Sequence, residues 1–166
     1  MAGTEAAVLD AGPIIHLDEI GALDLLGELA LVTPGAVWAE VERHRPRALE
    51  HALLASSRCS APHDERVAAL ATLLGLGAGE HEAMAVARQR SAMLLTDDTA
   101  ARVAAESPGL RAHGTLGIVI RAARTGRRSP AQVLALLEDL PRRSSLHLRA
   151  SLLAQVTREV RSAYGL

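Results

Sequence analysis

Aspartates follow two short apolar runs in this sequence. Asp10 comes directly after the run at 6–9, and Asp97 and Asp98 come shortly after the run at 93–95. Apolar runs of this length are typical of buried strands in parallel sheets. Because ligands bind outside the carboxyl ends of such strands, we expect these carboxylates to lie near one another at one edge of a sheet.

Glutamates supply further carboxylates. Glu80 and Glu82 follow a glycine-rich break and begin an expected helix, and Glu40 lies next to the apolar stripe of an earlier helix. Several carboxylates in one cleft repel one another and cannot all stay ionised without a cation. One or two Mg²⁺ or Mn²⁺ ions, which prefer oxygen ligands, would relieve this repulsion and could activate water for phosphodiester hydrolysis. The pattern therefore predicts metal-dependent hydrolysis.

Each acid also has a purely structural explanation. Any of the aspartates could cap the helix that follows it, and Glu80 and Glu82 suit the positive end of a helix dipole. Glu40 could lie on a solvated helix face. These alternatives stay open at the level of sequence, although the joint occurrence of strand-end aspartates favours a common site.

Short strands alternate with helices along the chain. Strands are expected at 6–9, 29–32, 93–95 and 110–112. Helices are expected at 14–29 with an interruption at Gly21, after Thr33-Pro34, and at 46–56, 64–74, 80–90, 99–106, 115–124, 130–137 and 146–163. This alternation predicts an α/β sandwich with a short, mainly parallel central sheet.

The composition limits the classes of function. The 166 residues include one Trp, one Tyr and no Phe, which excludes RNA-binding modules that stack bases on several aromatic side chains. The net charge of -1 conceals a segregation of charge. Residues 1–106 carry 8 Arg against 16 acids, whereas residues 107–166 carry 10 Arg against 3 acids.

The basic half contains the candidate RNA-binding residues, because Arg binds phosphate bidentately. These candidates are Arg121, Arg124, Arg127 and Arg128. The alternatives are an ordinary solvated helix face, a surface for an acidic protein partner, or pairing with the acidic surface of a second subunit.

Other chemistries lack their signatures. The chain has no Lys, so it carries neither a Walker motif nor the lysine that a phosphoacceptor receiver domain requires, and it has no GxSxG or HExxH motif. The seven His are scattered, and Cys59 has no partner for an intramolecular disulfide. No apolar run approaches the length of a membrane span and no signal peptide is evident, so we expect a soluble cytoplasmic protein without membrane contact.

Four segments, in this order and spacing, resemble the PIN-domain family. They are AAVLDAGPIIHL at 6–17, LVTPGAVWAEVER at 31–43, GAGEHEAMAVARQRSAMLLTDDTAAR at 77–102 and HGTLGIVIRAARTGR at 113–127. Within the family, the chain is similar to the compact prokaryotic branch that includes VapC-like toxin ribonucleases and related nucleic-acid-binding proteins.

The resemblance implies a three-layer α/β/α sandwich and a Mg²⁺- or Mn²⁺-dependent ribonuclease, usually a homodimer. The four acids of the family fall on Asp10, Glu40, Glu80 and Asp97. The implied metal ligands are Asp10, Glu80, Asp97 and Asp98, with Glu82 a neighbour that many relatives also carry. Thr115 could touch the metal site or the substrate phosphate, or cap its helix. The residue after the first acid, often a hydroxyl residue in this branch, is Ala11.

We therefore expect a PIN-like nuclease domain at 1–128 and a C-terminal helical extension at 129–166 packed on the same domain. The expected activity is metal-dependent endonucleolytic cleavage of single-stranded RNA, as the toxin of a toxin–antitoxin pair with a cognate antitoxin as partner. The alternative is a catalytically inactive PIN fold that binds nucleic acid or protein. The four acids favour activity.

Overall fold

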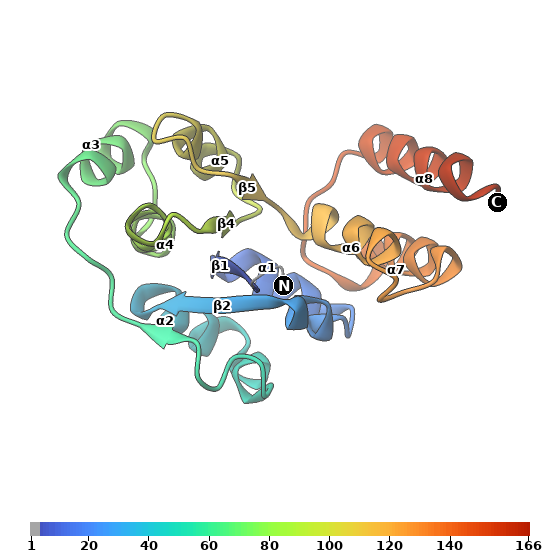
Figure 1. Cartoon of the computed structure of the whole chain (residues 1–166), viewed down its shortest axis with the longest axis horizontal. Helices are drawn as coiled ribbons and strands as arrows, with labels where there is room; N and C mark the ends of the chain where they lie inside the picture. The colour runs from blue at the N-terminus through green and yellow to red at the C-terminus, as the bar shows by residue number, and fades with distance from the viewer. Residues whose placement is uncertain (1–3) are drawn as a thin grey trace.

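The central sheet has five parallel strands. The computed structural model describes residues 4–166. The strands are β1 (Glu5–Leu9), β2 (Leu29–Pro34), β3 (Arg58–Cys59), β4 (Met93–Leu95) and β5 (Ala112–His113), in the order β3-β2-β1-β4-β5 (Figure 1). The order reverses between β1 and β4, because the chain builds outward from β1 through β2 to β3 and later from β4 to β5. This point is where a parallel sheet opens a crevice at its carboxyl edge.

Helices flank the sheet on both faces and complete the three-layer α/β/α sandwich. They are α1 (Ala11–Glu19), α2 (Gly35–His44), α3 (Glu65–Leu74), α4 (Ala78–Arg90), α5 (Thr99–Glu106), α6 (Thr115–Arg124), α7 (Pro130–Arg143) and α8 (Ala150–Tyr164), with short 3₁₀ helices η1 (Leu23–Glu28) and η2 (Pro46–Glu50). Parallel crossovers are right-handed, so α1, which leads from β1 to β2, and α5, which leads from β4 to β5 in the opposite direction, cover opposite faces. The expected fold class is confirmed.

The core is aliphatic, as the composition predicts. Leu9 of β1, Leu17 of α1 and Leu95 of β4 are fully buried in one cluster. Leu137 of α7 and Val160 of α8 belong to the same cluster, although these helices lie at the end of the molecule remote from α3 (Figure 1). The C-terminal extension therefore shares its apolar core with the sheet.

Several element boundaries differ from the expectation. The helix expected at 14–29 is divided into α1 and η1, because Gly21 adopts a left-handed backbone with φ of +67°. Only the 3₁₀ helix η2 and turns occupy most of 46–56, and strand β3, which two residues form, was not predicted. Two residues carry too little periodicity to indicate a strand.

Other corrections concern the ends of elements. Thr33 does not cap a helix: it ends β2 together with Pro34, and its hydroxyl lies 2.8 Å from Ser57 Oγ. The last strand lies at 112–113 rather than 110–112, and α7 continues to Arg143 through Pro141. Helix α8 begins at 150 instead of 146, and 144–149 forms neither helix nor strand. None of the described helices is long and apolar enough to cross a bilayer.

We predict that Leu137→Ala destabilises the whole domain. Leu137 is 1% exposed, and truncation of a buried leucine costs about 2–5 kcal/mol of unfolding free energy. Leu73→Ala is the matched control, because Leu73 is 79% exposed. Urea denaturation should show one cooperative transition, displaced only in Leu137→Ala. Separate unfolding of the extension, with the main transition unchanged, would contradict a shared core.

Candidate functional site

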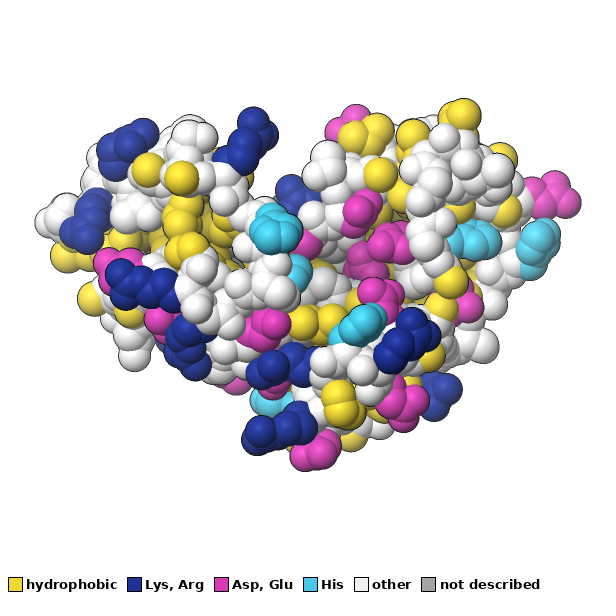
Figure 2. Space-filling view, turned by 180° about the vertical axis from the view of Figure 1, so that it is seen from behind, with side chains coloured by type: hydrophobic (Ala, Val, Ile, Leu, Met, Phe, Trp, Pro, Cys, Tyr) yellow, Lys and Arg dark blue, Asp and Glu magenta, His cyan; other side chains and the backbone are white. Residues whose placement is uncertain are grey.

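The carboxyl edge of the sheet brings the strand-end acids together. Leu9 of β1 pairs with Leu95 of β4, and the Asp10 amide donates a hydrogen bond of 2.9 Å to the Leu95 carbonyl. Asp10 therefore lies opposite Thr96, with Asp97 one residue further along. The adjacent strands are about 5 Å apart. Acidic side chains gather in a hollow on the side of the molecule that carries α2, α4 and α5 (Figure 2).

Asp10 is buried at the centre of this edge. Its side chain is only 4% exposed and caps α1, with Oδ1 accepting a hydrogen bond of 2.8 Å from the Ala11 amide. Oδ2 accepts a hydrogen bond of 2.6 Å from the Thr96 hydroxyl. Sequence reasoning missed Thr96, which supplies a hydroxyl to Asp10 although the residue after Asp10 is an alanine. Its sequence signal was a hydroxyl residue directly after the predicted strand at 93–95.

The electrostatic environment disfavours the ionised form of Asp10. Burial is the main cause and raises the pKa of Asp10 to about 7, with further increases from the charges of Glu80 and Glu40. Burial and then the charge of Glu80 also raise the pKa of Glu40. The structure therefore brings these three carboxyl groups close enough to repel one another, and their catalytic and metal-binding roles stay predictions.

A glycine leaves room between two of these acids. A Cβ on Gly79, the second residue of α4, would lie 2.9 Å from Glu40 Oε2 and 3.6 Å from Asp10 Oδ1. Glu80 is the next residue along and lies back toward the start of its own helix, near Gly77. The missing side chain thus leaves a small space that carboxylate oxygens border.

Glu82 and Asp98 are engaged elsewhere. Glu82 Oε2 accepts a hydrogen bond of 2.7 Å from the Ala36 amide at the start of α2. Asp98 Oδ1 accepts one of 2.7 Å from the Ala101 amide and caps α5. Asp98 therefore caps the helix that follows it, which is the structural explanation that the sequence left open. Its role as a metal ligand stays a prediction, as does that of Glu82.

Asp97 is held by groups from two helices. Oδ1 accepts a hydrogen bond of 2.7 Å from the Thr115 amide, and Oδ2 accepts one of 2.6 Å from the Thr115 hydroxyl and lies 2.7 Å from His16 Nδ1. Burial raises the pKa of Asp97, but the hydrogen bonds from His16 and Thr115 outweigh burial and bring this pKa below its ordinary value. Asp97 is therefore ionised at neutral pH.

Thr115 and His16 thus belong to the site. Thr115 does not cap its helix with its own side chain: Gly114 occupies the capping position of α6, and the Thr115 hydroxyl contacts Asp97. His16 was treated as one of the scattered histidines. The signal in the sequence was Gly12, one helical turn before His16. In the structure, a Cβ at Gly12 would lie 3.4 Å from Asp97 Cβ. Gly12 therefore lets α1 approach Asp97 closely.

The donor set fits a hard divalent cation. In residues 4–166, no three His, Cys, Asp or Glu side chains are already arranged around one point as metal ligands. Mg²⁺ needs only one or two carboxylates, because it keeps several waters. Asp10 and Glu40 border the space at Gly79, and each oxygen of Asp10 accepts a single hydrogen bond, which leaves one lone pair free. These oxygens could therefore hold such an ion.

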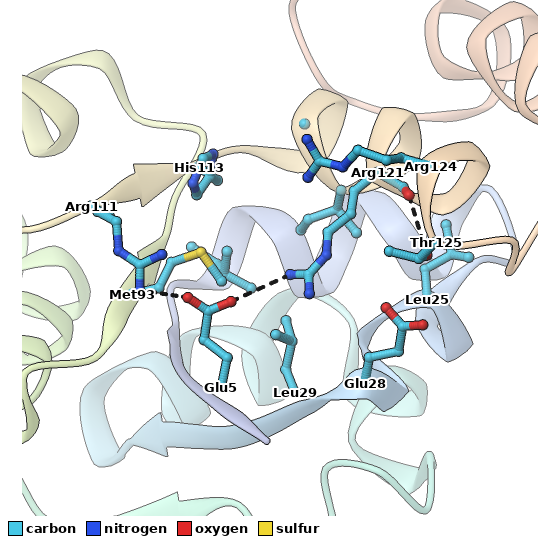
Figure 3. Close-up of a pocket in the computed structure, with 13 residues that line it drawn as sticks. Glu5, Leu25, Glu28, Leu29, Met93, Arg111, His113, Arg121, Arg124 and Thr125 are labelled. Carbon is cyan, nitrogen blue, oxygen red and sulfur yellow. Dashed lines mark hydrogen bonds and ion pairs between the residues drawn. The ribbon is translucent and has the colours of Figure 1, made fainter. Parts of the chain in front are cut away.

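The candidate RNA-binding arginines do not reach this edge. Helix α6 begins against Asp97 and extends about 15 Å, which places Arg121 and Arg124 toward its far end. Arg121 and Arg124 line a pocket of about 270 Å³ beside the amino ends of β1, β2 and β4, where Glu5 lies between Arg111 and Arg121 (Figure 3).

The other two arginines bind to the 3₁₀ helix η1. Arg128 forms an ion pair of 2.7 Å with the Asp24 carboxylate, and Arg127 donates a hydrogen bond of 2.7 Å to the Asp24 carbonyl. The structure therefore does not form a track of these arginines beside the acids, and their contact with RNA stays a prediction.

We predict that Asp10 makes the metal-free protein less stable as pH rises. Folded Asp10 keeps its proton up to about pH 7, whereas the unfolded chain loses it above 3.8. In this window the folded state binds more protons, so stability falls with rising pH, by on the order of 4 kcal/mol in total. Urea denaturation with a chelator should show Asp10→Asn gaining stability over the wild type across this window. A constant difference would contradict the shift.

Comparison with known proteins identifies the family. A family model described as a PIN domain matches residues 6–162, which includes the acidic edge and most of the C-terminal extension. No curated protein and no solved structure in the comparisons matches the chain. The match spans nearly the whole chain and agrees with the parallel sheet and its flanking helices. The chain therefore belongs to the PIN-domain family, whose fold is of the nuclease type.

Proposed function

We propose that this PIN domain is a metal-dependent endoribonuclease that cleaves single-stranded RNA in the cytoplasm. The observation that carries the proposal is the buried Asp10, which borders the space left by Gly79 together with Glu40 and is acted on by the charge of Glu80. A structural role does not require this cluster, because burial and mutual repulsion of carboxylates cost free energy. A cation that replaces the proton on Asp10 would offset that cost.

Asp10, Glu40 and Glu80 would hold Mg²⁺ or Mn²⁺, as one or two ions. When bound, such an ion supplies an activated water and charge stabilisation for the phosphate. Thr96 and the Ala11 amide fix the direction of the Asp10 carboxylate through their hydrogen bonds. Because the protein supplies these bonds in advance, the oxygens that face the Gly79 space need not reorganise.

Asp97 closes the other side of the crevice. His16 and the two groups of Thr115 leave it ionised and rigid, with one lone pair of Oδ1 free. Its expected role is to hold a cation or to position a water near the phosphate. His16 transmits a constraint from α1 to Asp97 and acts as a positioning residue.

Partners form part of the proposal. We propose that the chain forms a homodimer and, as a toxin-type member of its family, is silenced by a cognate antitoxin that enters the acidic crevice. A basic side chain from such an antitoxin would neutralise the carboxylates without supporting RNA cleavage. The acidic edge would then also serve as the binding site for the inhibitor. Light scattering of the purified chain tests the dimer directly.

We predict that Asp10→Asn abolishes RNA cleavage. The substitution keeps hydrogen-bonding groups for Thr96 and Ala11 but removes the charge, so the rate of cleavage of a single-stranded RNA in Mn²⁺ should fall by about a hundredfold or more. Asp139→Asn is the control, since Asp139 lies on α7 and contacts Arg143. Undiminished cleavage by Asp10→Asn would refute the catalytic assignment. Absence of both cleavage and Mn²⁺ binding in the wild type would support an inactive binding module.

We predict that Glu80 and Glu82 differ in their effect on metal binding. Glu80→Gln removes a charge that acts on Asp10 and Glu40, so calorimetry should show Mn²⁺ binding weakened about tenfold. Glu82→Gln keeps an oxygen for the Ala36 amide and should bind Mn²⁺ like the wild type. The two variants are matched in chemistry and differ by two positions on one helix. A larger loss in Glu82→Gln would reverse the assignment.

A further inference from the structure

A cleft adjoins the acidic edge on the side of the C-terminal extension. It has a volume of about 540 Å³ and lies between α5 with β5 on one side and the segment at 146–149 with the start of α8 on the other. The space-filling view shows this cleft as a notch between the two parts of the molecule (Figure 2). Asp97 lines one end of the cleft, so the cleft opens directly onto the proposed site.

Arg102 of α5 is anchored at this junction. Its Nε donates a hydrogen bond of 3.2 Å to the carbonyl of Thr96, the residue whose hydroxyl holds Asp10. In residues 4–166, no carboxylate lies within ion-pair distance of its guanidinium. The remaining nitrogens of Arg102 are therefore free to bind an anion, although the side chain is fixed close to the site.

Gly114 provides the space for the tip of Arg102. A Cβ at this position would lie 1.9 Å from Arg102 Nη2 and 2.6 Å from Asp97 Oδ1. The backbone at Gly114 has φ of -109°, which any residue adopts, so conformation does not require glycine here. Close approach of Arg102 and Asp97 does require it. Arg102 is not among the predicted RNA-binding residues, because it lies in the acid-rich half of the chain.

The cleft is electropositive apart from Asp97. Arg102 faces it from one wall, and the exposed Arg149 and His147 face it from the other. Asp97 is the one acid in the lining and is already engaged by His16 and Thr115. The acidic hollow repels a polyanion, whereas the basic side chains of this cleft would attract it.

We propose that Arg102 binds a phosphate next to the scissile phosphate and that the cleft takes the adjoining single-stranded RNA backbone. This inference rests on the proposed ribonuclease function and adds the path of the substrate. The planar guanidinium suits a phosphate bidentately, and Arg149 supplies a second contact across the cleft. Leu116 and Leu148 in the lining offer apolar contact to a base without aromatic stacking. Arg102 is then a substrate-positioning residue of the site.

Binding to a fluorescein-labelled oligouridylate tests the proposal. The measurement uses the full chain carrying Asp10→Asn, so that no cleavage interferes. Adding Arg102→Gln should weaken binding about tenfold and reduce the slope of log K against log salt by about 0.7, the value for one phosphate contact on a single strand. Arg149→Gln, an exposed position across the cleft, should have an effect of the same kind. Arg158→Gln on the exposed face of α8 is the matched control and should change neither quantity.

The outcomes separate the two proposals. Mn²⁺ binding by Arg102→Gln should equal that of the wild type, and Arg102→Lys, which keeps the charge without the planar fork, should recover part of the binding. Equal affinity and salt slope in Arg102→Gln, Arg149→Gln and Arg158→Gln would overturn the cleft assignment even if the enzyme cleaves RNA. Arg102-dependent binding of polyglutamate, with none of oligouridylate, would also overturn it and assign the cleft to an acidic protein segment. Failure of the wild type to cleave RNA would refute the ribonuclease function itself.

Discussion

The geometry of the crevice depends on which groups surround the carboxylates at the carboxyl edge of the parallel sheet. Four of these carboxylates accept hydrogen bonds from amides at helix N-termini: Asp10 at α1, Glu82 at α2, Asp98 at α5 and Asp97 at α6. A helix N-terminus carries unpaired amides and partial positive charge, which stabilise an anion. Asp10 is the exception in effect, because burial outweighs its hydrogen bonds and keeps the proton on the group.

This difference divides the acids into two kinds. Asp97, Asp98 and Glu82 have protein partners that satisfy them, whereas Glu40 and Glu80 have no hydrogen bond from the described residues and act on Asp10 through charge. The negative charge of the carboxylates is therefore least compensated beside the space that Gly79 leaves. A cation with oxygen ligands suits that imbalance, because it neutralises charge and needs room. Asp97, Asp98 and Glu82 also bind the N-termini of helices that surround the crevice.

The segregation of charge along the chain has a different meaning in three dimensions. The basic C-terminal half does not form one track, since Arg121 and Arg128 pair with Glu5 and Asp24 near the amino ends of the strands. Arg102, which donates a hydrogen bond to the Thr96 carbonyl beside the proposed site, comes from the acidic half. A charge count along the sequence describes how basic or acidic each segment is. It does not show at which edge of the folded sheet the charged side chains lie.

The sequence by itself determined the fold class and indicated which acids would lie near the carboxyl edge of the sheet. Apolar runs that end in aspartate indicate parallel strands with polar carboxyl ends, and local periodicity is enough to indicate an amphipathic helix such as α6. It could not show strand β3, the partners of Asp97, or the separate positions of Glu80 and Glu82, because each depends on contacts between residues far apart in the chain. Only the tertiary structure decided these, since Gly12, Gly79 and Gly114 act through what approaches them in space. The sequence does not show which side chain packs into the space that a glycine leaves.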